Sequence, residues 1–215
     1  MVKPSLLCSI LAAGVLAGAA TGCATRAVQP FDSAADLELV TTPGGDLAKV
    51  WARGADGVVK VTGEPSGYVA TRAGYANYRM HLEWRWPGKP GNAGVLLHVA
   101  SGPRDRVWPL SVQVQTKHGA AGDLLPMAGA SFVEPLTSAP GAATAVKARV
   151  GANSEKPAGE WNSADILCRD GVIEVTVNGV AQNRVSGANP RAGRIGFQLE
   201  GAPYELRQLR IEPLP

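Results

Sequence analysis

Hydrophobic and polar residues alternate strictly along residues 78–86, which read YRMHLEWRW. Alternation over this length is typical of a β-strand with one face in a core and the other facing water or a ligand. One predicted face carries the large apolar side chains Tyr78, Met80, Leu82, Trp84 and Trp86. The opposite face carries Arg79, His81, Glu83 and Arg85.

The same period of two, or a short apolar run, recurs through the rest of the chain. Asn178-Gly179 lies between two such runs and favours a two-residue hairpin turn, because both turn positions need positive φ. No segment has a sustained helical period, and the Ala-, Gly-, Ser- and Pro-rich stretch 129–156 predicts a long loop with at most one strand, near 145–150. The chain is therefore expected to be all-β, a sandwich or jelly roll of two antiparallel sheets. The further predicted strands are 94–99, 110–117, 165–167, 172–177, 180–185, 194–199 and 204–211.

Composition narrows the classes of function. The chain has 215 residues, of which 45% are hydrophobic and 18% charged, enough for one packed core rather than several. Its net charge is only +3 and no run of Lys and Arg stands out, so nucleic acid is not an expected partner. Three cysteines without a CxxC pair, and the lack of an HExxH spacing, argue against a disulfide framework and against a zinc enzyme.

The first residues have the layout of a bacterial export signal, with one cation at Lys3, an apolar run over 6–20 and small residues before Cys23. Small residues directly before a cysteine resemble the lipobox, in which that cysteine is acylated and becomes the mature N-terminus. We therefore expect a lipoprotein-type signal peptide at 1–22 and lipidation of Cys23; an ordinary signal peptide cleaved nearby is the alternative. Acyl chains would anchor the protein to the bacterial envelope without spanning the membrane. Ala24, in place of Asp, favours the outer membrane, with the protein facing the periplasm.

Seven blocks follow one another along the chain. They are Gly67-Tyr68-Val69-Ala70-Thr71, residues 78–85, Asn92-Ala93-Gly94-Val95-Leu96-Leu97-His98, residues 113–123, Gly159-Glu160-Trp161-Asn162, Val177-Asn178-Gly179, and residues 193–201 with Glu205-Leu206-Arg207. Together, over residues 47–213, they resemble the 3-keto-disaccharide hydrolase family. The resemblance implies a concanavalin A-like jelly-roll fold and substrates that are glycosides with a ketone at C3. It makes 47–215 the sugar-active domain, after a lipid-anchored tether and lead-in segment over 23–46.

Two blocks depart from the family pattern. Asn92-Ala93-Gly94 stands where the family commonly has Asn-Ser-Gly, a mild change. Gln113-Val114-Gln115 stands where the family commonly has Glu-x-Gln, so an amide replaces a carboxylate.

A ketone at C3 acidifies the hydrogen on C2, so that a base can remove it and the resulting enolate can expel the group on C1; water then adds. This reaction needs no nucleotide cofactor. A separate glucoside 3-dehydrogenase in the same envelope would supply the keto sugar, and the other partner expected is the membrane, through the lipid anchor.

The reaction needs a general base near C2, donors for the enolate oxygen and an acid for the leaving oxygen. If the polar faces of strands 78–85, 110–117 and 194–200 line the concave side of one sheet, they form a basic, amide-rich trough that His98 joins from a neighbouring strand. Imidazole titrates near neutral pH, which suits His98 to the role of base or acid. The candidate catalytic residues are His98, Glu83, Lys117 and Glu160. The candidate substrate-binding residues are Arg85, Asn92, Gln113, Gln115, His118, Asp123, Trp161, Asn162, Gln198 and Glu200.

Structural explanations compete at several of these positions. Glu83 and Arg85 can pair with charges on adjacent strands, Trp161 can pack in the core, and Asp123 can cap a turn. The same fold with an amide at Gln113 can also serve as a non-catalytic carbohydrate-binding envelope lipoprotein, or as a purely structural one. No metal-binding residues are predicted, and a structural calcium held by loop carboxylates stays open.

Overall fold

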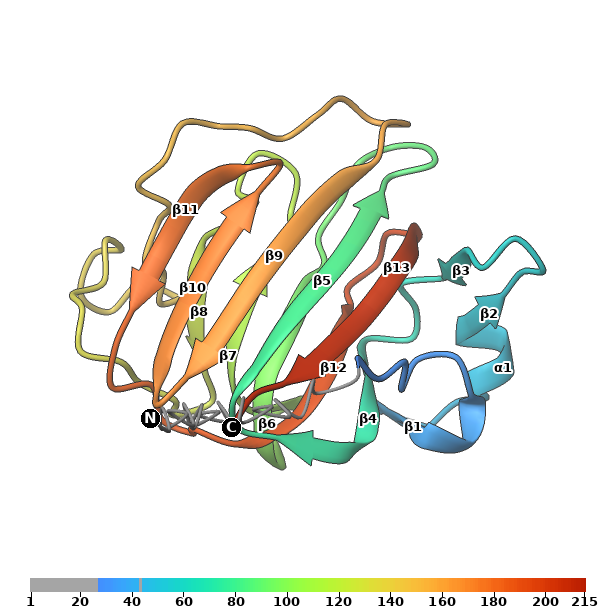
Figure 1. The fold of residues 1–215 in the computed structure, drawn as a ribbon, viewed down its shortest axis with the longest axis horizontal. Coiled ribbons are helices and arrows are strands. Elements are labelled where there is room, and N and C mark those ends of the chain that lie inside the picture. The colour runs from blue at the N-terminus through green and yellow to red at the C-terminus, as the bar shows by residue number, and fades with distance from the viewer. Residues whose placement is uncertain (1–26, 43) are drawn as a thin grey trace, which may run out of the picture.

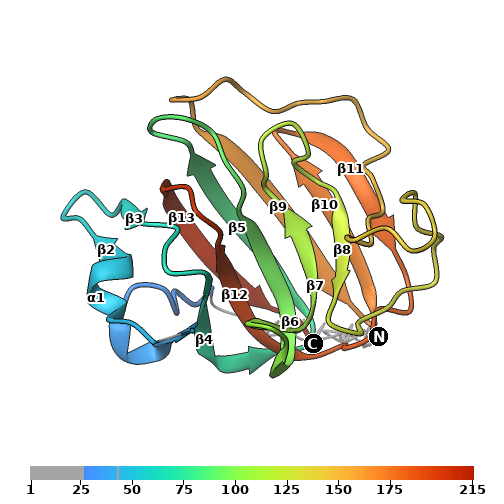
Figure 2. The same ribbon diagram turned by 180° about the vertical axis from the view of Figure 1, so that it is seen from behind.

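The chain folds into two antiparallel β-sheets that lie face to face, one in front of the other in Figures 1 and 2. The computed structural model describes residues 27–42 and 44–215. Helix within these residues is confined to η1 (Ala34–Asp36) and α1 (Leu47–Val50). The first sheet has six strands, in the order β1 (Leu37–Thr41), β4 (Gly67–Tyr75), β12 (Gly193–Leu199), β6 (Gly94–Asp105), β7 (Trp108–Gln115) and β8 (Leu124–Met127). The second has seven, in the order β11 (Val180–Val185), β10 (Val172–Val177), β9 (Asn162–Arg169), β5 (Tyr78–Arg85), β13 (Tyr204–Pro213), β3 (Val59–Val61) and β2 (Trp51–Arg53).

The core lies between the two sheets, because each strand turns its apolar face inward. On β5 the side chains of Tyr78, Leu82 and Trp84 are at most 1% exposed, and Phe197 on β12 is equally buried in the facing sheet. Burial of one such side chain stabilises a fold by about 1.5–3 kcal/mol. Strands distant in sequence, such as β4 and β12, lie side by side. The predicted all-β, concanavalin A-like jelly roll is confirmed.

The six-stranded sheet is covered on its second face as well. Gln113 and Gln198 alternate with core residues on β7 and β12, yet they are at most 3% exposed. Residues 143–146 of the long loop 128–161 cover part of this face. The β6–β7 hairpin covers another part, and its Gly102 lies against the side chain of Tyr68 on β4. This second face is thus the floor of a partly covered pocket.

The alternating patterns identified most of the strands. All eight predicted strands exist, with ends shifted by a few residues, and the loop 128–161 contains the predicted loop 129–156 and extends beyond it. The predicted strand near 145–150 is wrong, because Lys147 forms only an isolated bridge with Leu124. Five strands were not predicted: β1, β2, β3, β4 and β8.

The folded domain begins earlier than the predicted boundary at residue 47. Phe31 is 1% exposed in the core, β1 pairs with β4, and Val28 N donates to Ile211 O at 2.7 Å. Residues 27–42 therefore belong to the sandwich rather than to a tether. The predicted signal peptide and Cys23 lie outside the described residues. None of the helices in the described part has the length and apolar character needed to cross a membrane.

Candidate functional site

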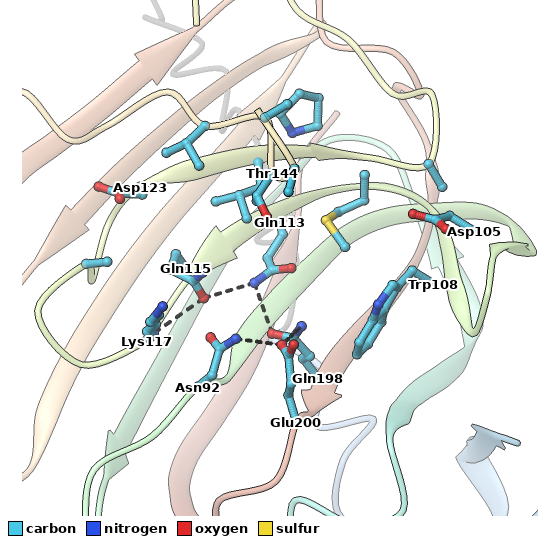
Figure 3. A pocket seen from close by; sticks show the side chains of 18 of the residues that line it. Asn92, Asp105, Trp108, Gln113, Gln115, Lys117, Asp123, Thr144, Gln198 and Glu200 are labelled. Atoms are coloured by element: carbon cyan, nitrogen blue, oxygen red, sulfur yellow. Dashed lines mark hydrogen bonds between the residues drawn. The ribbon is translucent and has the colours of Figure 1, made fainter. Parts of the chain in front are cut away.

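A cavity of about 360 Å³ opens on the second face of the six-stranded sheet (Figure 3). Polar side chains of β7 and β12 form its floor, while β8, residues 143–146 and the turn of the β6–β7 hairpin form its walls. A volume in this range is typical of small-molecule sites. We call it the amide cavity, after its lining, which includes Asn92, Asp105, Arg106, Trp108, Gln113, Gln115, Lys117, Asp123, Thr144, Gln198 and Glu200.

A chain of hydrogen bonds joins three glutamines, an asparagine and a carboxylate on the cavity floor (Figure 3). Gln113 Nε2 donates to Gln115 Oε1 at 2.9 Å and to Gln198 Oε1 at 3.0 Å. Gln198 Nε2 and Asn92 Nδ2 donate in turn to Glu200 Oε2, at 2.5 and 2.6 Å. The polar faces predicted for β7 and β12 therefore do meet in one site.

The carboxylate fixes the orientation of the amides. An ionised carboxylate only accepts hydrogen bonds, so Gln198 turns its Nε2 toward Glu200 and its Oε1 toward Gln113. Gln113 then uses its Nε2 as the donor, and its Oε1 accepts no hydrogen bond from the described part of the chain. Asn92 Oδ1 is likewise buried without a donor there. Buried acceptors usually have a partner, so these two oxygens are hydrogen-bonding capacity that the described residues leave unused beside the cavity.

Gly94 makes room for this network. It lies on β6, between β12 and β7, and a Cβ atom at this position would stand 2.4 Å from Gln113 Nε2. Any side chain at Gly94 would therefore displace the Gln113 amide. In the block Asn92-Ala93-Gly94, the first residue binds Glu200 and the third leaves space for Gln113, so both ends of the block serve the same site.

Glu200 follows β12 directly and forms a bridge with Asn92. Burial raises the pKa of the Glu200 carboxyl above its ordinary value. The nearby Lys117 and Arg106 cations, and the hydrogen bond from Asn92, lower this pKa in part. Glu200 is therefore a stronger base than an exposed carboxylate, and it stands near two cations.

Three lining residues that the sequence analysis missed come from the β6–β7 hairpin. They are Asp105, Arg106 and Trp108. Arg106 occupies the turn with φ of 55°, and its Nε lies 3.7 Å from Asp105 Oδ1. The run Asp105-Arg106 followed by an apolar pair could have indicated a turn. No local sequence pattern predicts that the hairpin folds over the sheet. Thr144, in the long loop, was missed for the same reason.

Seven of the predicted site residues line the amide cavity. Asp123 also accepts a hydrogen bond from Arg149 N at 2.8 Å, so it holds a turn as well as lining the cavity. The full set is Asn92, Gln113, Gln115, Lys117, Asp123, Gln198 and Glu200.

Glu83, Arg85 and Trp161 lie elsewhere, contrary to the prediction. β5 belongs to the seven-stranded sheet, and its polar face points away from the core on the side opposite to the amide cavity. Glu83 pairs with Arg207 at 2.5 Å and Arg85 with Glu205 at 2.6 Å. The ring of Trp161 lies against both guanidinium groups, with its centroid 4.6 Å from Arg85 Cζ and 4.1 Å from Arg207 Cζ. The competing explanation, cross-strand charge pairing, holds for Glu83 and Arg85.

His98 is not positioned to act as the base or acid. Its side chain is 1% exposed, and its ring nitrogens lie 3.2 Å from Pro190 O and 3.1 Å from Ala76 O. Burial lowers the pKa of His98, although the two carbonyl oxygens favour the charged form. The ring packs edge-on against Tyr78. His98 therefore ties the β4–β5 turn to the segment before β12, and it does not line the amide cavity.

The last three predicted residues also lie outside the cavity lining. Glu160 is exposed in a turn where its N–H donates to Pro157 O. His118 Nδ1 lies 3.0 Å from the buried carboxylate of Glu155, which pins the loop after β7. Asn162 Oδ1 accepts from Lys156 N at 2.7 Å. These contacts are structural, and a sequence pattern alone does not distinguish them from ligand contacts.

The carboxylates around the amide cavity are held by other groups of the chain. Asp105 contacts Arg106, Asp123 accepts from Arg149, and Glu200 accepts from two amides. Across residues 27–42 and 44–215, no three or more His, Cys, Asp and Glu side chains gather in a way that could hold a metal ion.

Several solved structures share the fold. A protein from Parabacteroides distasonis ATCC 8503, provisionally designated a glycosyl hydrolase, is 22% identical, with a TM-score of 0.61 over 84% of this chain and 89% of that chain. The β-glucanase of Bacillus licheniformis is 10% identical, with a TM-score of 0.58 over 91% and 100%. The carbohydrate-binding module CBM66 of Bacillus subtilis is 9% identical, with a TM-score of 0.57 over 82% and 95%. Such identities establish the shared fold alone.

No curated protein matches the chain in sequence. The family model of the 3-keto-alpha-glucoside-1,2-lyase-like domain matches residues 32–212, and it therefore begins within the segment that the fold adds before residue 47. The resemblance inferred from the order of the seven blocks is confirmed. The chain belongs to the family of 3-keto-α-glucoside-1,2-lyase-like domains.

Proposed function

We propose that the protein cleaves glycosides whose sugar ring carries a ketone at C3, and that the reaction takes place in the amide cavity. Membership of the family makes the protein carbohydrate-related. The observation that carries the proposal is Glu200, a partly buried carboxylate with a raised pKa that lies among amides and near two cations. A base with those surroundings suits removal of a proton next to a ketone.

In the proposed reaction Glu200 removes the proton from C2, and the C–H electron pair forms the enolate of the C3 ketone. The ketone then reforms, a double bond forms between C1 and C2, and the bond from C1 to the leaving oxygen breaks. The proton held by Glu200 passes to that oxygen, so a single carboxyl group balances the step. Addition of water across the double bond, with its proton returned to C2, completes the hydrolysis.

The cations of the cavity supply the second requirement, stabilisation of the enolate oxygen. Lys117 and Arg106 are close enough to Glu200 to lower its pKa. The same charges can stabilise the negative charge that moves from Glu200 to the substrate oxygen, which is where fixed cations contribute most. Polar side chains that line the cavity, among them Gln115 and Asp123, would bind sugar hydroxyls.

The test compares a 3-keto-glucoside that bears a chromogenic leaving group with the same glucoside left unoxidised. We expect release from the keto compound alone, because only its C2 proton is acidic. The incubation is repeated in deuterated water, and the recovered keto sugar should carry deuterium at C2. Release from both glucosides at equal rates, or release from the keto compound without deuterium at C2, would contradict elimination.

A second function, non-catalytic carbohydrate binding, is favoured by one observation. Gln113 is an amide where the family commonly has a carboxylate, and its Nε2 donates to two other amides of the cavity floor, as a carboxylate could not. A binding module of this kind would bind both glucosides and release the chromophore from neither. Calorimetric titration with the two glucosides, run beside the release assay, separates the two functions.

The location and supply of the substrate are part of the same proposal. We infer an exported protein that is lipid-anchored through Cys23 to the bacterial envelope, as the N-terminal sequence predicts. A separate enzyme that oxidises the C3 hydroxyl of a glucoside has to make the substrate, because the elimination itself performs no oxidation. Labelling of cells with a clickable fatty acid, compared between the native chain and Cys23→Ser, tests the anchor.

A further inference from the structure

The amide of Gln113 is the branch point of the hydrogen-bond chain on the floor of the amide cavity (Figure 3). Its Nε2 carries two hydrogens, and both are donated, one to Gln115 Oε1 at 2.9 Å and the other to Gln198 Oε1 at 3.0 Å. Gln113 is 1% exposed and Gln198 is 3% exposed, so bulk water hardly competes for these two bonds.

The neighbours of Gln113 permit only one orientation of its amide. Gln115 Oε1 also faces the backbone N–H of Lys117, at 3.4 Å, so Gln115 has to present its oxygen here. Gln198 has to present its Oε1 to Gln113, because its Nε2 is donated to Glu200. Turning the Gln113 amide over would set its oxygen against two other oxygens, none of which can donate.

The direction of these bonds determines what Glu200 meets. Because Gln113 donates, the Nε2 of Gln198 is left to donate to Glu200 Oε2 at 2.5 Å, and Asn92 Nδ2 adds a second donor at 2.6 Å. Hydrogen bonds donated to a carboxylate favour its ionised form. If the group at position 113 accepted instead, Gln198 would turn its Nε2 toward that group and its oxygen toward Glu200. An oxygen can take that place only when the carboxyl group of Glu200 is protonated and donates.

We propose that Gln113 is a positioning residue for the general base, because its two donated hydrogen bonds set the direction of the chain so that Glu200 receives donors and is ionised. This inference rests on the proposed function, in which Glu200 is the base, and it adds the residue that controls the protonation of that base. It also explains what an amide at position 113 provides, since a carboxylate there could only accept.

The other charged groups around Glu200 are the same whichever residue stands at position 113. The cations are Lys117, two residues beyond β7, and Arg106 in the β6–β7 hairpin; both oppose the rise that burial causes in the pKa of Glu200. The carboxylates that line the same cavity are Asp105, beside Arg106, and Asp123. A comparison between variants at positions 113 and 115 therefore leaves these contributions unchanged.

The test places a carboxylate at two positions of the same chain of amides. Gln113→Glu replaces the donor at the branch point by a group that only accepts, so it should reverse Gln198. Gln115→Glu adds the same charge to the same strand, at a position whose oxygen already accepts from Gln113 Nε2 and Lys117 N, so the direction is kept. The pKa of Glu200 is measured by NMR titration of protein with isotopically labelled glutamate carboxyl groups. The resonance of Glu200 is identified by its absence from Glu200→Gln.

We expect the pKa of Glu200 to be higher in Gln113→Glu than in Gln115→Glu by about one pH unit or more, because in the first variant Glu200 has to donate. The acidic limb of the pH profile of kcat/KM for a 3-keto-glucoside should move up with it. A merely structural role of Gln113 would lower the rate without moving that limb. An equal or lower pKa in Gln113→Glu would show that the added charge acts alone, and would overturn the positioning role.

The titration does not depend on catalysis, so the two proposals fail separately. If the native protein cleaves no 3-keto-glucoside, the proposed function fails, and the pKa comparison still decides whether Gln113 controls the ionisation of Glu200. If Gln113→Glu does not fold, the double variant Gln113→Glu/Glu200→Gln takes its place. It carries a single carboxylate at the other end of a reversed chain, so it should regain the native circular dichroism spectrum. A double variant that stays unfolded would overturn the assignment.

Discussion

The two outward faces of the sandwich are both polar, but their carboxylates have different hydrogen-bond partners. On the outer face of the seven-stranded sheet, Glu83 lies 2.5 Å from Arg207, and Arg85 lies 2.6 Å from Glu205. On the floor of the amide cavity, Glu200 accepts its hydrogen bonds from neutral amides, and its pKa is raised by burial. Charges neutralised in pairs serve the sheet, whereas a carboxylate bound only by amides keeps its basicity for a ligand.

The tryptophans of the two faces differ in the same way. Trp161 has a guanidinium group over its ring at 4.6 Å from Arg85 and another at 4.1 Å from Arg207. Trp108 lines the amide cavity. An indole that already contacts two of the protein's own cations has less surface free for a sugar. The polar pattern of a strand therefore indicates a face that meets water or lines a cavity. The partners of the charged residues on that face then show whether their role is structural or chemical.

The largest expected effect comes from exchanging a carboxylate for an amide on each face. Glu200→Gln should lower kcat/KM for a 3-keto-glucoside by about 10²–10⁴-fold, the usual contribution of a general base, while sugar affinity is retained. The matched variant Glu83→Gln should stay within about twofold of the native rate, because its partner Arg207 is on the outer face. Chromophore release and calorimetric titration measure the two quantities. A similar loss of rate in both variants would remove Glu200 from the mechanism.

The next effect concerns the space that Gly94 leaves for the amide network. In Gly94→Ala the new methyl group would fall 2.4 Å from Gln113 Nε2, so the Gln113 side chain has to move. We expect sugar affinity to fall about tenfold, the scale of one hydrogen bond, because Gln113 holds the side chains of Gln115 and Gln198 in place. Gly88→Ala is the control, because nothing lies within 4 Å of a Cβ there. Unchanged affinity in Gly94→Ala would mean that the position of Gln113 does not affect sugar binding.

Most of the strands predicted from the sequence alternate between apolar and polar residues. β5 and β7 were found in this way, but β4 was not, because Gly67 to Thr71 are all buried and the segment shows no alternation. β2 and β3 have only three residues each, too few for a pattern. The segment 27–42 was assigned to a tether because its few apolar residues, such as Phe31, are separated by polar ones.

The site was predicted only in part for a different reason. Alternation correctly placed Gln113 and Gln115 on one face of β7, and Gln198 on one face of β12. It could not say which sheet β5 joins, since sheet membership depends on pairing with strands distant in sequence, here β9 and β13. Glu83 and Arg85 were therefore assigned to the wrong face. The hairpin that brings Arg106 and Trp108 over the sheet is equally a matter of tertiary structure.

A smaller effect tests the outer face alone. Trp161→Ala removes two contacts between an indole and a guanidinium group, each worth about 0.5–1 kcal/mol at an exposed site. We expect a decrease of about 1–2 kcal/mol in the free energy of unfolding, measured by urea denaturation, with no change in cleavage of a 3-keto-glucoside. A loss of cleavage in a variant that stays folded would show that this face, too, takes part in the function.

The smallest effect is the pH dependence of stability that Glu200 contributes. Because its pKa is higher in the folded protein than the ordinary value of the unfolded chain, the folded state holds this proton more tightly. The contribution of Glu200 to the free energy of unfolding is fully present below the ordinary pKa of the unfolded chain. It is lost as the pH rises through the raised pKa of the folded protein. Glu200→Gln is neutral at every pH and escapes the loss. Its free energy of unfolding, relative to the native protein, should therefore increase as the pH rises from the ordinary pKa of a glutamate carboxyl through the raised pKa of Glu200.

Glu174→Gln, on the exposed outer face beside Arg184, controls for the loss of one negative charge. Urea denaturation of the native protein and the two variants across the pH range gives the free energy of unfolding of each variant relative to the native protein. An increase confined to Glu200→Gln means that the native chain keeps, in its cavity, a carboxylate that costs it stability. A residue retained at such a cost is expected where activity needs it, as it is for a general base. A difference that is flat with pH would show that Glu200 titrates as an ordinary carboxyl, and would remove the reason for choosing it as the base.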